Sequence, residues 1–190
     1  MARPKSEDKY QALLAAAVAV CSVLGLEAPT SKIARTAGVA EGTLFTYFKT
    51  KDELLNQLYL ELKKEMGLVM LSDFPRTETL RGRMYFFWSK YIHWGTQNPN
   101  KRKVIGQLSV SERITPESKA AAMSIFSEAQ GLLDECIKNS QLQHVSCAFV
   151  SSMMIALADT TMEFILREPL DIEQYCVTGF DAFWRALGCN

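Results

Sequence analysis

Residues 30–54, TSKIARTAGVAEGTLFTYFKTKDEL, decide the fold of the N-terminal part of the chain. Two short segments with helical spacing, 31–37 and 41–48, flank Gly38-Val39-Ala40. Glycine adopts a positive φ at little cost, so Gly38 is suited to ending the first helix and turning the chain, and Gly25 is suited to ending the helix expected over 7–24. Two short helices joined by such a turn predict a helix-turn-helix.

The second of these helices has two chemically different faces. Leu44, Phe45 and Phe48 are apolar, and we expect them to pack against Ile33 and Ala34 of the first helix. The other face carries small and hydroxyl-bearing side chains, which suit a DNA major groove about 12 Å wide. These outward residues are Gly42, Thr43, Thr46 and Tyr47.

Two further residues lie where helices are expected to begin. Lys51 stands at the start of the helix expected over 52–71, where its ammonium and the helix dipole both favour a phosphate. Thr30 is expected to cap the helix over 31–37, in a similar position. Both are therefore candidates for contacts to the DNA backbone.

The remainder of the chain also has helical periodicity, and no stretch shows the period-2 alternation of a strand. Thr50 and Glu53 form a capping-box pattern, and Thr115 precedes Pro116 as an N-cap. The sequence predicts an all-α fold of about nine helices, over 7–24, 31–37, 41–48, 52–71, 77–97, 101–111, 116–139, 142–167 and 171–187.

Charge and hydropathy place the chain among ordinary globular proteins. Its 190 residues include 21 Lys+Arg and 21 Asp+Glu, so it is not a polycation, and the slight basic excess lies in the N-terminal third. The longest unbroken apolar run, 12–21, is shorter than the ~18 residues of a membrane span. Glu7 and Asp8 interrupt the basic N-terminus that a signal peptide would need. We expect a cytoplasmic protein without a membrane partner.

The residues that carry metal and nucleophilic chemistry are sparse. The two histidines, His93 and His144, form no HExxH pattern, and the five cysteines show no CxxC spacing. Asp159 and Glu163 are four residues apart without a partnering histidine, which favours a solvated or interface edge. We expect no enzyme activity, metal or cofactor, and reduced, mostly core-filling thiols at Cys21, Cys136, Cys147, Cys176 and Cys189.

The C-terminal two-thirds offers candidates for a ligand site. The helix expected over 77–97 is apolar on nearly all sides, as a central buried helix is. Methionine and aromatic side chains suit large hydrophobic ligands, although such residues can also simply fill a core. The candidate lining residues are Tyr59, Met66, Met70, Met84, Trp88, Tyr91, Leu133, Met153 and Met154.

The stretch from about Lys9 to Leu58 resembles the DNA-binding domain of the TetR family of bacterial repressors. The run IARTAGVAEGTLFTYFKTKDEL follows the family pattern IA-x-x-AGV, GTLY-x-YF and K-x-x-L in register. Ala40 stands where members often carry a serine or threonine cap, and Thr46 occupies a variable, base-facing position. The candidate DNA-contact residues are Thr30, Lys32, Ala40, Glu41, Gly42, Thr43, Thr46, Tyr47 and Lys51.

The resemblance implies a domain for DNA binding over 1–52 and one for ligand binding and dimerisation over 53–190. It also implies that the last two long helices pair with their counterparts in a four-helix dimer interface, for which small residues permit close approach. The candidate interface residues are Ala148, Ser152, Ala156, Phe180, Phe183 and Trp184.

The function so implied is a homodimeric repressor of the multidrug type. A hydrophobic small molecule would release it from a palindromic operator in double-stranded DNA. The alternative is a DNA-binding dimer with no small-molecule inducer, whose C-terminal domain serves only dimerisation.

Overall fold

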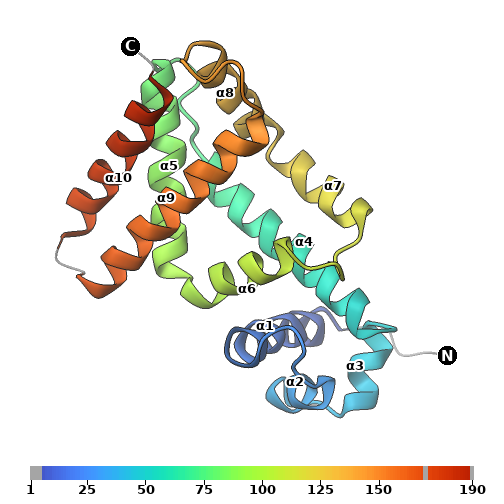
Figure 1. Ribbon diagram of the computed structural model, residues 1–190. Helices are drawn as coiled ribbons and strands as arrows, with labels where there is room; N and C mark the ends of the chain where they lie inside the picture. The colour runs from blue at the N-terminus through green and yellow to red at the C-terminus, as the bar shows by residue number, and fades with distance from the viewer. Residues whose placement is uncertain (1–5, 169–170, 189–190) are drawn as a thin grey trace. The chain divides into compact units, whose positions relative to one another are not determined.

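The computed structural model describes residues 6–168 and 171–188, and over these ranges the protein is entirely helical (Figure 1). The all-α prediction is confirmed, with ten helices in the described chain. They are α1 (Glu7–Leu24), α2 (Thr30–Thr36), α3 (Glu41–Tyr47), α4 (Lys51–Leu71), α5 (Leu80–Gln97), α6 (Pro99–Ser109), α7 (Pro116–Ile125), α8 (Ser127–Lys138), α9 (Cys147–Arg167) and α10 (Ile172–Leu187).

The helices form two compact units that do not follow the order of the chain. The N-terminal unit comprises the described residues up to Glu65 together with Asn98–Ser124, and the C-terminal unit comprises Met66–Gln97 and the chain from Ile125 onward. Helix α4 passes from the first unit into the second, while α6 and most of α7 belong to the first.

In the N-terminal unit, α1 supplies the central apolar surface. Leu13, Ala17 and Cys21 are fully buried on α1, and both α2 and α6 pack against this helix (Figure 1). Gly25 ends α1 with φ +77°, and Gly38 turns the chain between α2 and α3 with φ +71°. These are the two positions at which the sequence predicted helix-ending glycines, and the left-handed conformation explains the choice of residue.

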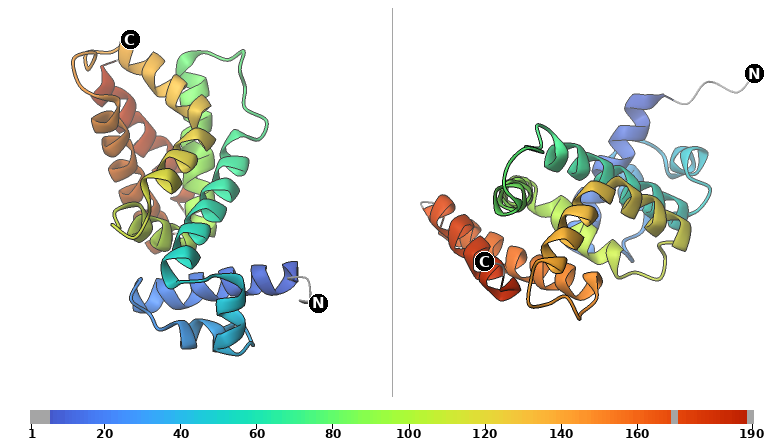
Figure 2. Two further views of the ribbon diagram at one scale, coloured as in Figure 1. Left: turned by 90° about the vertical axis from the view of Figure 1, so that its right-hand side faces the viewer. Right: turned by 90° about the horizontal axis from the view of Figure 1, so that it is seen from above.

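In the C-terminal unit, α9 and α10 lie side by side and antiparallel, and α5 packs against both (Figures 1 and 2). Trp88 of α5 stacks on Phe183 of α10, with ring centroids 6.1 Å apart and planes at 7°. Its indole N–H donates to the Cys176 carbonyl oxygen at 3.0 Å, which satisfies the polar atom that a buried tryptophan carries. This aromatic contact fixes α5 against α10.

The helix predicted over 116–139 is two helices. Phe126, with φ −102° and ψ 20°, leaves helical geometry between α7 and α8. Gly67 of α4 lies against this break, because a Cβ there would be 2.5 Å from Ile125 Cγ2 and 3.6 Å from the Phe126 ring. The turn at Phe126 thus goes with close packing of both side chains on α4.

Helix α9 begins at Cys147, five residues later than predicted. Ser146 is its N-cap, and the Ser146 hydroxyl accepts the Phe149 N–H at 3.3 Å.

Helix α9 is also long and apolar enough to cross a membrane, with a mean hydropathy of 1.4 over 18 residues, 33% of them buried. Polar residues such as Ser151, Ser152 and Asp159 interrupt its apolar runs, so it does not stand out in the sequence. Its membrane signal is weak, since α9 carries Asp159 and Glu163 and packs on α5 and α10.

Most described cysteines fill the interior. Cys21, Cys136 and Cys176 are buried, and Cys147 is partly exposed. Burial, followed by the nearby Glu173 carboxylate, raises the pKa of Cys176 to about 11. The thiol is therefore protonated and unreactive at neutral pH, in keeping with a packing role. Cys189 lies outside the described residues.

The close approach of α10 to α9 and α5 depends on Gly179. A Cβ at this position would lie 2.2 Å from Thr161 Oγ1 and 3.0 Å from the Trp88 ring. We expect Gly179→Ala to lower the free energy of unfolding by about 1–3 kcal/mol, measured by urea denaturation. Gly106→Ala is the matched control, because a Cβ on this helical glycine meets nothing within 4 Å. The control should be neutral or stabilising by up to about 1 kcal/mol, and equal effects of the two variants would contradict the packing argument.

Candidate nucleic-acid interface

The two helices of the helix-turn-helix are joined at their starts. The Thr30 hydroxyl donates to Glu41 Oε1 at 2.6 Å, which connects the first residue of α2 to the first residue of α3. Pro29, not Thr30, is the N-cap of α2, and it provides no side-chain cap. The prediction that Thr30 caps this helix is therefore wrong: Thr30 is already helical, and its hydroxyl bonds to α3 instead.

One residue of α3, Phe45, lies on a different face of the helix from the one predicted. Leu44 and Phe48 are buried as predicted, but Phe45 is 43% exposed. Successive helical residues are 100° apart, so a face that buries Leu44 and Phe48 turns Phe45 toward solvent. Its ring adds apolar area to the surface that also carries Gly42 and Thr46, and a helical projection of the sequence would have found it.

The hydroxyl groups of α3 are partly engaged within the protein. Thr46 donates to the Gly42 carbonyl oxygen at 3.1 Å, which leaves lone pairs on the Thr46 oxygen as acceptors. The Tyr47 hydroxyl accepts the Ser6 backbone N–H at 2.9 Å. Tyr47 therefore also holds the first turn of α1 against the end of α3.

The predicted DNA-contact residues occupy the exposed side of this motif. Lys32, Ala40, Glu41, Gly42 and Thr46 are exposed, and Thr30, Thr43, Tyr47 and Lys51 are half-buried. A Cβ at Gly42 would meet nothing within 4 Å, so packing alone does not require glycine there. The sequence reasoning passed over two exposed basic residues of the same segment, Arg35 on α2 and Lys49 before α4.

Thr50 and Glu53 cap the start of α4 as predicted, except that the Glu53 carboxylate bonds to the residue before the N-cap. The Glu53 N–H donates to Thr50 Oγ1 at 3.0 Å. The Glu53 carboxylate reaches back to the Lys49 N–H at 2.7 Å, one residue before the N-cap. These two bonds order the loop between α3 and α4, which carries the exposed Lys49 and leads into Lys51, the first residue of α4.

A cluster of charged residues links this loop to two other segments of the N-terminal unit. Arg113, between α6 and α7, donates to Asp52 Oδ1 at 2.6 Å and to both carboxylate oxygens of Glu27 at 2.9 and 3.0 Å. Glu27, between α1 and α2, also lies 3.7 Å from the Lys51 ammonium. We call Glu27, Lys51, Asp52 and Arg113 the charged junction. Hydrogen bonds to Asp52 and Glu27 raise the pKa of Arg113, so its charge is permanent.

Asn56 of α4 is buried and bonds to the backbone of two members of the charged junction, Asp52 and Arg113. Its Nδ2 donates to the Asp52 and Arg113 carbonyl oxygens, both at 2.8 Å, and its Oδ1 accepts the Thr115 N–H at 3.0 Å. At the other end of α6, the Lys101 ammonium lies 2.7 Å from the Glu65 carboxylate of α4. Helix α6 and the loop after it are thus bonded to α4 at both ends.

The candidate ligand residues are mostly interior. Tyr59 is buried in the N-terminal unit; Met66, Met70, Met84, Trp88, Leu133 and Met154 are buried in the C-terminal unit, where Tyr91 and Met153 are half-buried. Trp88 packs against α10.

Among the described residues, two buried side-chain atoms have no hydrogen-bond partner. They are Arg83 Nε on α5 and Gln107 Oε1 on α6.

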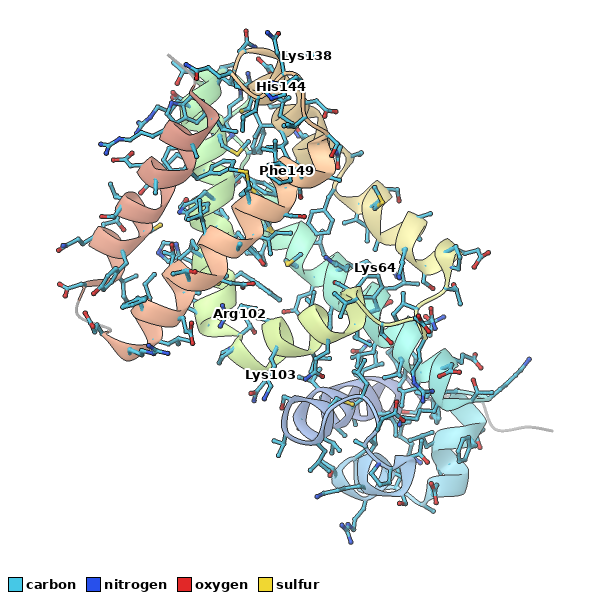
Figure 3. The ribbon with its side chains drawn as sticks, viewed as in Figure 1. Lys64, Arg102, Lys103, Lys138, His144 and Phe149 are labelled. Atoms are coloured by element: carbon cyan, nitrogen blue, oxygen red, sulfur yellow. The ribbon has the colours of Figure 1, made fainter. Side chains whose placement is uncertain are left out.

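The candidate dimer residues fall into two groups. Ala148, Ser152 and Ala156 of α9 are exposed, whereas Phe180, Phe183 and Trp184 of α10 are buried within the chain itself, at 1%, 0% and 9% exposure. The sequence reasoning missed the large apolar side chains that these helices do expose. They are Phe149, Ile155, Phe164, Leu166, Ile172 and Val177, and Figure 3 labels Phe149 on the first turn of α9.

Helices α1 to α3, with the exposed face of α3, have the arrangement of a helix-turn-helix DNA-binding domain. Comparisons with known proteins narrow the class of protein. Residues 13–58 match the family model of bacterial regulatory proteins of the tetR family. A proposed tetR family transcription regulator from Shewanella sp. PV-4 has a solved structure with a TM-score of 0.83 and 25% identity, covering 96% of this chain and 99% of that one. The chain thus shares the fold of a tetR family transcription regulator, and its residues 13–58 match the model of that family.

Two other relatives carry more specific names. The fatty acid metabolism regulator protein of Bacillus subtilis (strain 168) is 34% identical over 89 residues, which span 46% of each chain. The match therefore covers about half the length of that curated relative. The structure of the transcriptional regulator FadR from Bacillus subtilis in complex with stearoyl-CoA has a TM-score of 0.67 and 21% identity, covering 92% of this chain and 97% of that one. This last comparison shows a shared fold.

The bonds of Asn56 give a stability prediction. We expect Asn56→Leu to lower the free energy of unfolding by about 1–3 kcal/mol, because the Arg113 carbonyl and the Thr115 N–H would each lose a buried partner. Gln57→Leu, at the neighbouring half-buried position, is the control and should change stability little. Urea denaturation of both variants measures the difference, and a wild-type midpoint for Asn56→Leu would show that the amide does not hold the loop.

Proposed function

We propose that this protein is a homodimeric, ligand-responsive repressor that acts in the cytoplasm on a palindromic operator. Residues 1–52 read the DNA, and residues 53–190 bind the ligand and form the dimer. The observation that carries the proposal is the exposed face of α3, with its glycine, hydroxyl and aromatic groups, on a helix-turn-helix of the TetR family. A protein of this class regulates transcription by occupying DNA and requires no catalytic residues.

In this proposal α3 enters the major groove. Gly42 and Ala40 allow the backbone to approach the phosphates, while Thr43 and Thr46 face base edges as donors and acceptors. Thr30, Lys32, Tyr47 and Lys51 contact phosphates on either side. Glu41 orients Thr30 through their 2.6 Å bond. Phosphate contacts fix the register of α3, and the short side chains of α3 supply sequence readout.

The dimer forms through α9 and α10. Their exposed side chains alternate small residues such as Ala156 with large apolar ones such as Ile155 and Val177, so that two copies can approach closely and still bury apolar area. A pair of helices that packs on its own copy around a two-fold axis gives a four-helix interface. The same axis matches an operator built of two inverted half-sites. Phe180 and Phe183 support this surface from beneath.

The ligand is a large, mainly apolar molecule held by the methionine and aromatic residues named above. The Bacillus subtilis regulator FadR, which shares this fold, was solved with stearoyl-CoA, and this precedent supports a ligand with a long apolar chain. Ligand binding lowers operator affinity only by its preference for one conformation, typically ~1–3 kcal/mol or about 5–150-fold. The close packing of Trp88 on Phe183 favours a second candidate, a dimeric regulator without an inducer.

Two substitutions test the phosphate contacts. We expect Tyr47→Phe and Lys51→Gln to weaken operator binding roughly three- to tenfold, by similar factors for specific and unrelated DNA, since phosphate contacts carry little base information. Lys51→Gln should also lower the salt slope by about 1. Fluorescence anisotropy at several salt concentrations measures both. Lys138→Gln, the same charge change at the end of α8, is the control. Wild-type affinity and salt slope in both variants would remove these residues from the interface.

A pair of valines tests the dimer surface. Val177 of α10 is 40% exposed and Val110, after α6, is 83% exposed. We expect Val177→Asp to yield monomers at micromolar concentration, because the carboxylate would be buried without a partner in the dimer. Val110→Asp should leave the dimer intact. Analytical ultracentrifugation distinguishes the species, and a wild-type protein that sediments as a monomer, free and on DNA, would refute the dimer.

A further inference from the structure

The outer face of α3 carries a phenylalanine ring. Phe45 is 43% exposed, although Leu44 and Phe48 beside it are buried at 0% and 1%. Elsewhere in the described chain, the exposed phenylalanines are Phe149 and Phe164, and both belong to α9. Within the described N-terminal unit, Phe45 is thus the exposed phenylalanine, and it lies on the helix proposed to enter the major groove.

Contacts at both ends of α3 keep this ring on the outside. At the first residue, the Thr30 hydroxyl donates to Glu41 Oε1 at 2.6 Å. At the last, the Ser6 N–H donates to the Tyr47 hydroxyl at 2.9 Å. These bonds, together with the buried side of the helix, fix the rotation of α3 about its own axis. The Phe45 ring is therefore already placed for a contact, and no rearrangement of the helix is needed to present it.

The neighbours of the ring on this face donate few hydrogen bonds. The Thr46 hydroxyl gives its one hydrogen to the Gly42 carbonyl oxygen at 3.1 Å, so Thr46 retains a methyl group and acceptor lone pairs. Gly42 has no side chain, and a Cβ there would meet nothing within 4 Å, so the surface one turn before the ring is open. The outer face at positions 42, 45 and 46 is consequently more apolar than its sequence indicates.

A phenyl ring forms no ordinary hydrogen bond to a base edge or a phosphate, which limits what it recognises in DNA. In the major groove, thymine alone carries a methyl group, whereas the other bases present only hydrogen-bonding groups that differ among them. Packing a methyl group on a ring removes apolar area from water and is favourable. A ring set against a donor or acceptor would leave that group unpaired, which is costly.

We propose that Phe45 determines part of the operator sequence by packing on the C5-methyl group of one thymine in each half-site. The inference rests on the proposed function, in which α3 lies in the major groove, and it adds the chemical group that one side chain reads. Phe45 makes no phosphate contact in this arrangement. Its contribution therefore depends on the DNA sequence, in contrast to the contributions of Tyr47 and Lys51.

Replacing thymine by uracil tests this contact, because uracil lacks the methyl group and keeps every hydrogen-bonding group of thymine. An operator is first selected from random-sequence duplex DNA with the full-length wild-type protein. Each thymine of its half-site is then replaced by deoxyuridine at both symmetry-related positions, and binding is measured by fluorescence anisotropy. We expect a position at which uracil lowers affinity about 15-fold, or about fourfold per half-site, as burial of one methyl group implies.

Variants of Phe45 assign this position to the phenyl ring. Phe45→Ala should bind the thymine and uracil operators equally, while Phe45→Leu, which keeps an apolar side chain, should retain part of the preference for thymine. The salt slope of Phe45→Ala should equal that of wild type, because no phosphate contact is lost. Val110→Ala removes an exposed apolar side chain elsewhere in the same unit. This control should show the full wild-type preference.

The outcomes separate the inference from the function on which it rests. If uracil at every thymine leaves wild-type affinity unchanged, the role of Phe45 is overturned and operator binding stands. This scan requires no variant, so it does not depend on the folding of one. Full discrimination by Phe45→Ala, or a loss of affinity equal for specific and unrelated DNA, would also overturn the inference. Failure to select any operator would instead contradict the proposed repressor itself.

Discussion

The buried amide of Asn56 bonds three backbone groups of the N-terminal unit, and the arrangement of helices around the helix-turn-helix depends on it. Through its amide, the beginning of α4 is bonded to the loop after α6. The Arg113 side chain bonds the same loop to Glu27, in the connection between α1 and α2. The ion pairs are exposed and contribute little by themselves, but the buried amide requires its partners. The loop after α6 is therefore bonded to the chain on both sides of the helix-turn-helix, to Glu27 before it and to α4 after it.

This junction explains why the N-terminal unit contains helices from two separated parts of the chain. Helix α6 packs on α1 and is bonded to α4 near both of its ends, through Lys101 and through Arg113. Lys51 lies in the charged junction and is also a candidate phosphate contact. Glu27 pairs with both Lys51 and Arg113, so the loss of either ion pair would change the electrostatic surroundings of the other cation.

In the C-terminal unit, the aromatic residues of α10 face inward and the small and aliphatic residues of α9 and α10 face outward. Trp88, Phe180 and Phe183 fix α10 to α5, so the outer surface is presented by a rigid pair of helices. The apolar composition of α9, which resembles a membrane span by length and hydropathy, belongs to a helix that packs on α5 and α10 and exposes Phe149, Ile155 and Phe164 elsewhere.

The sequence by itself determined the helical fold, the helix-turn-helix, the glycine turns at Gly25 and Gly38 and the cap at Thr50, because these features depend on spacing and on backbone preferences of single residues. The exposure of Phe45, the break at Phe126 and the burial of Phe180 could not be found in the same way. Each depends on which neighbour occupies the space beside the residue: Leu44 takes the inward position on α3, Gly67 admits Ile125, and Gly179 lets α10 approach Trp88.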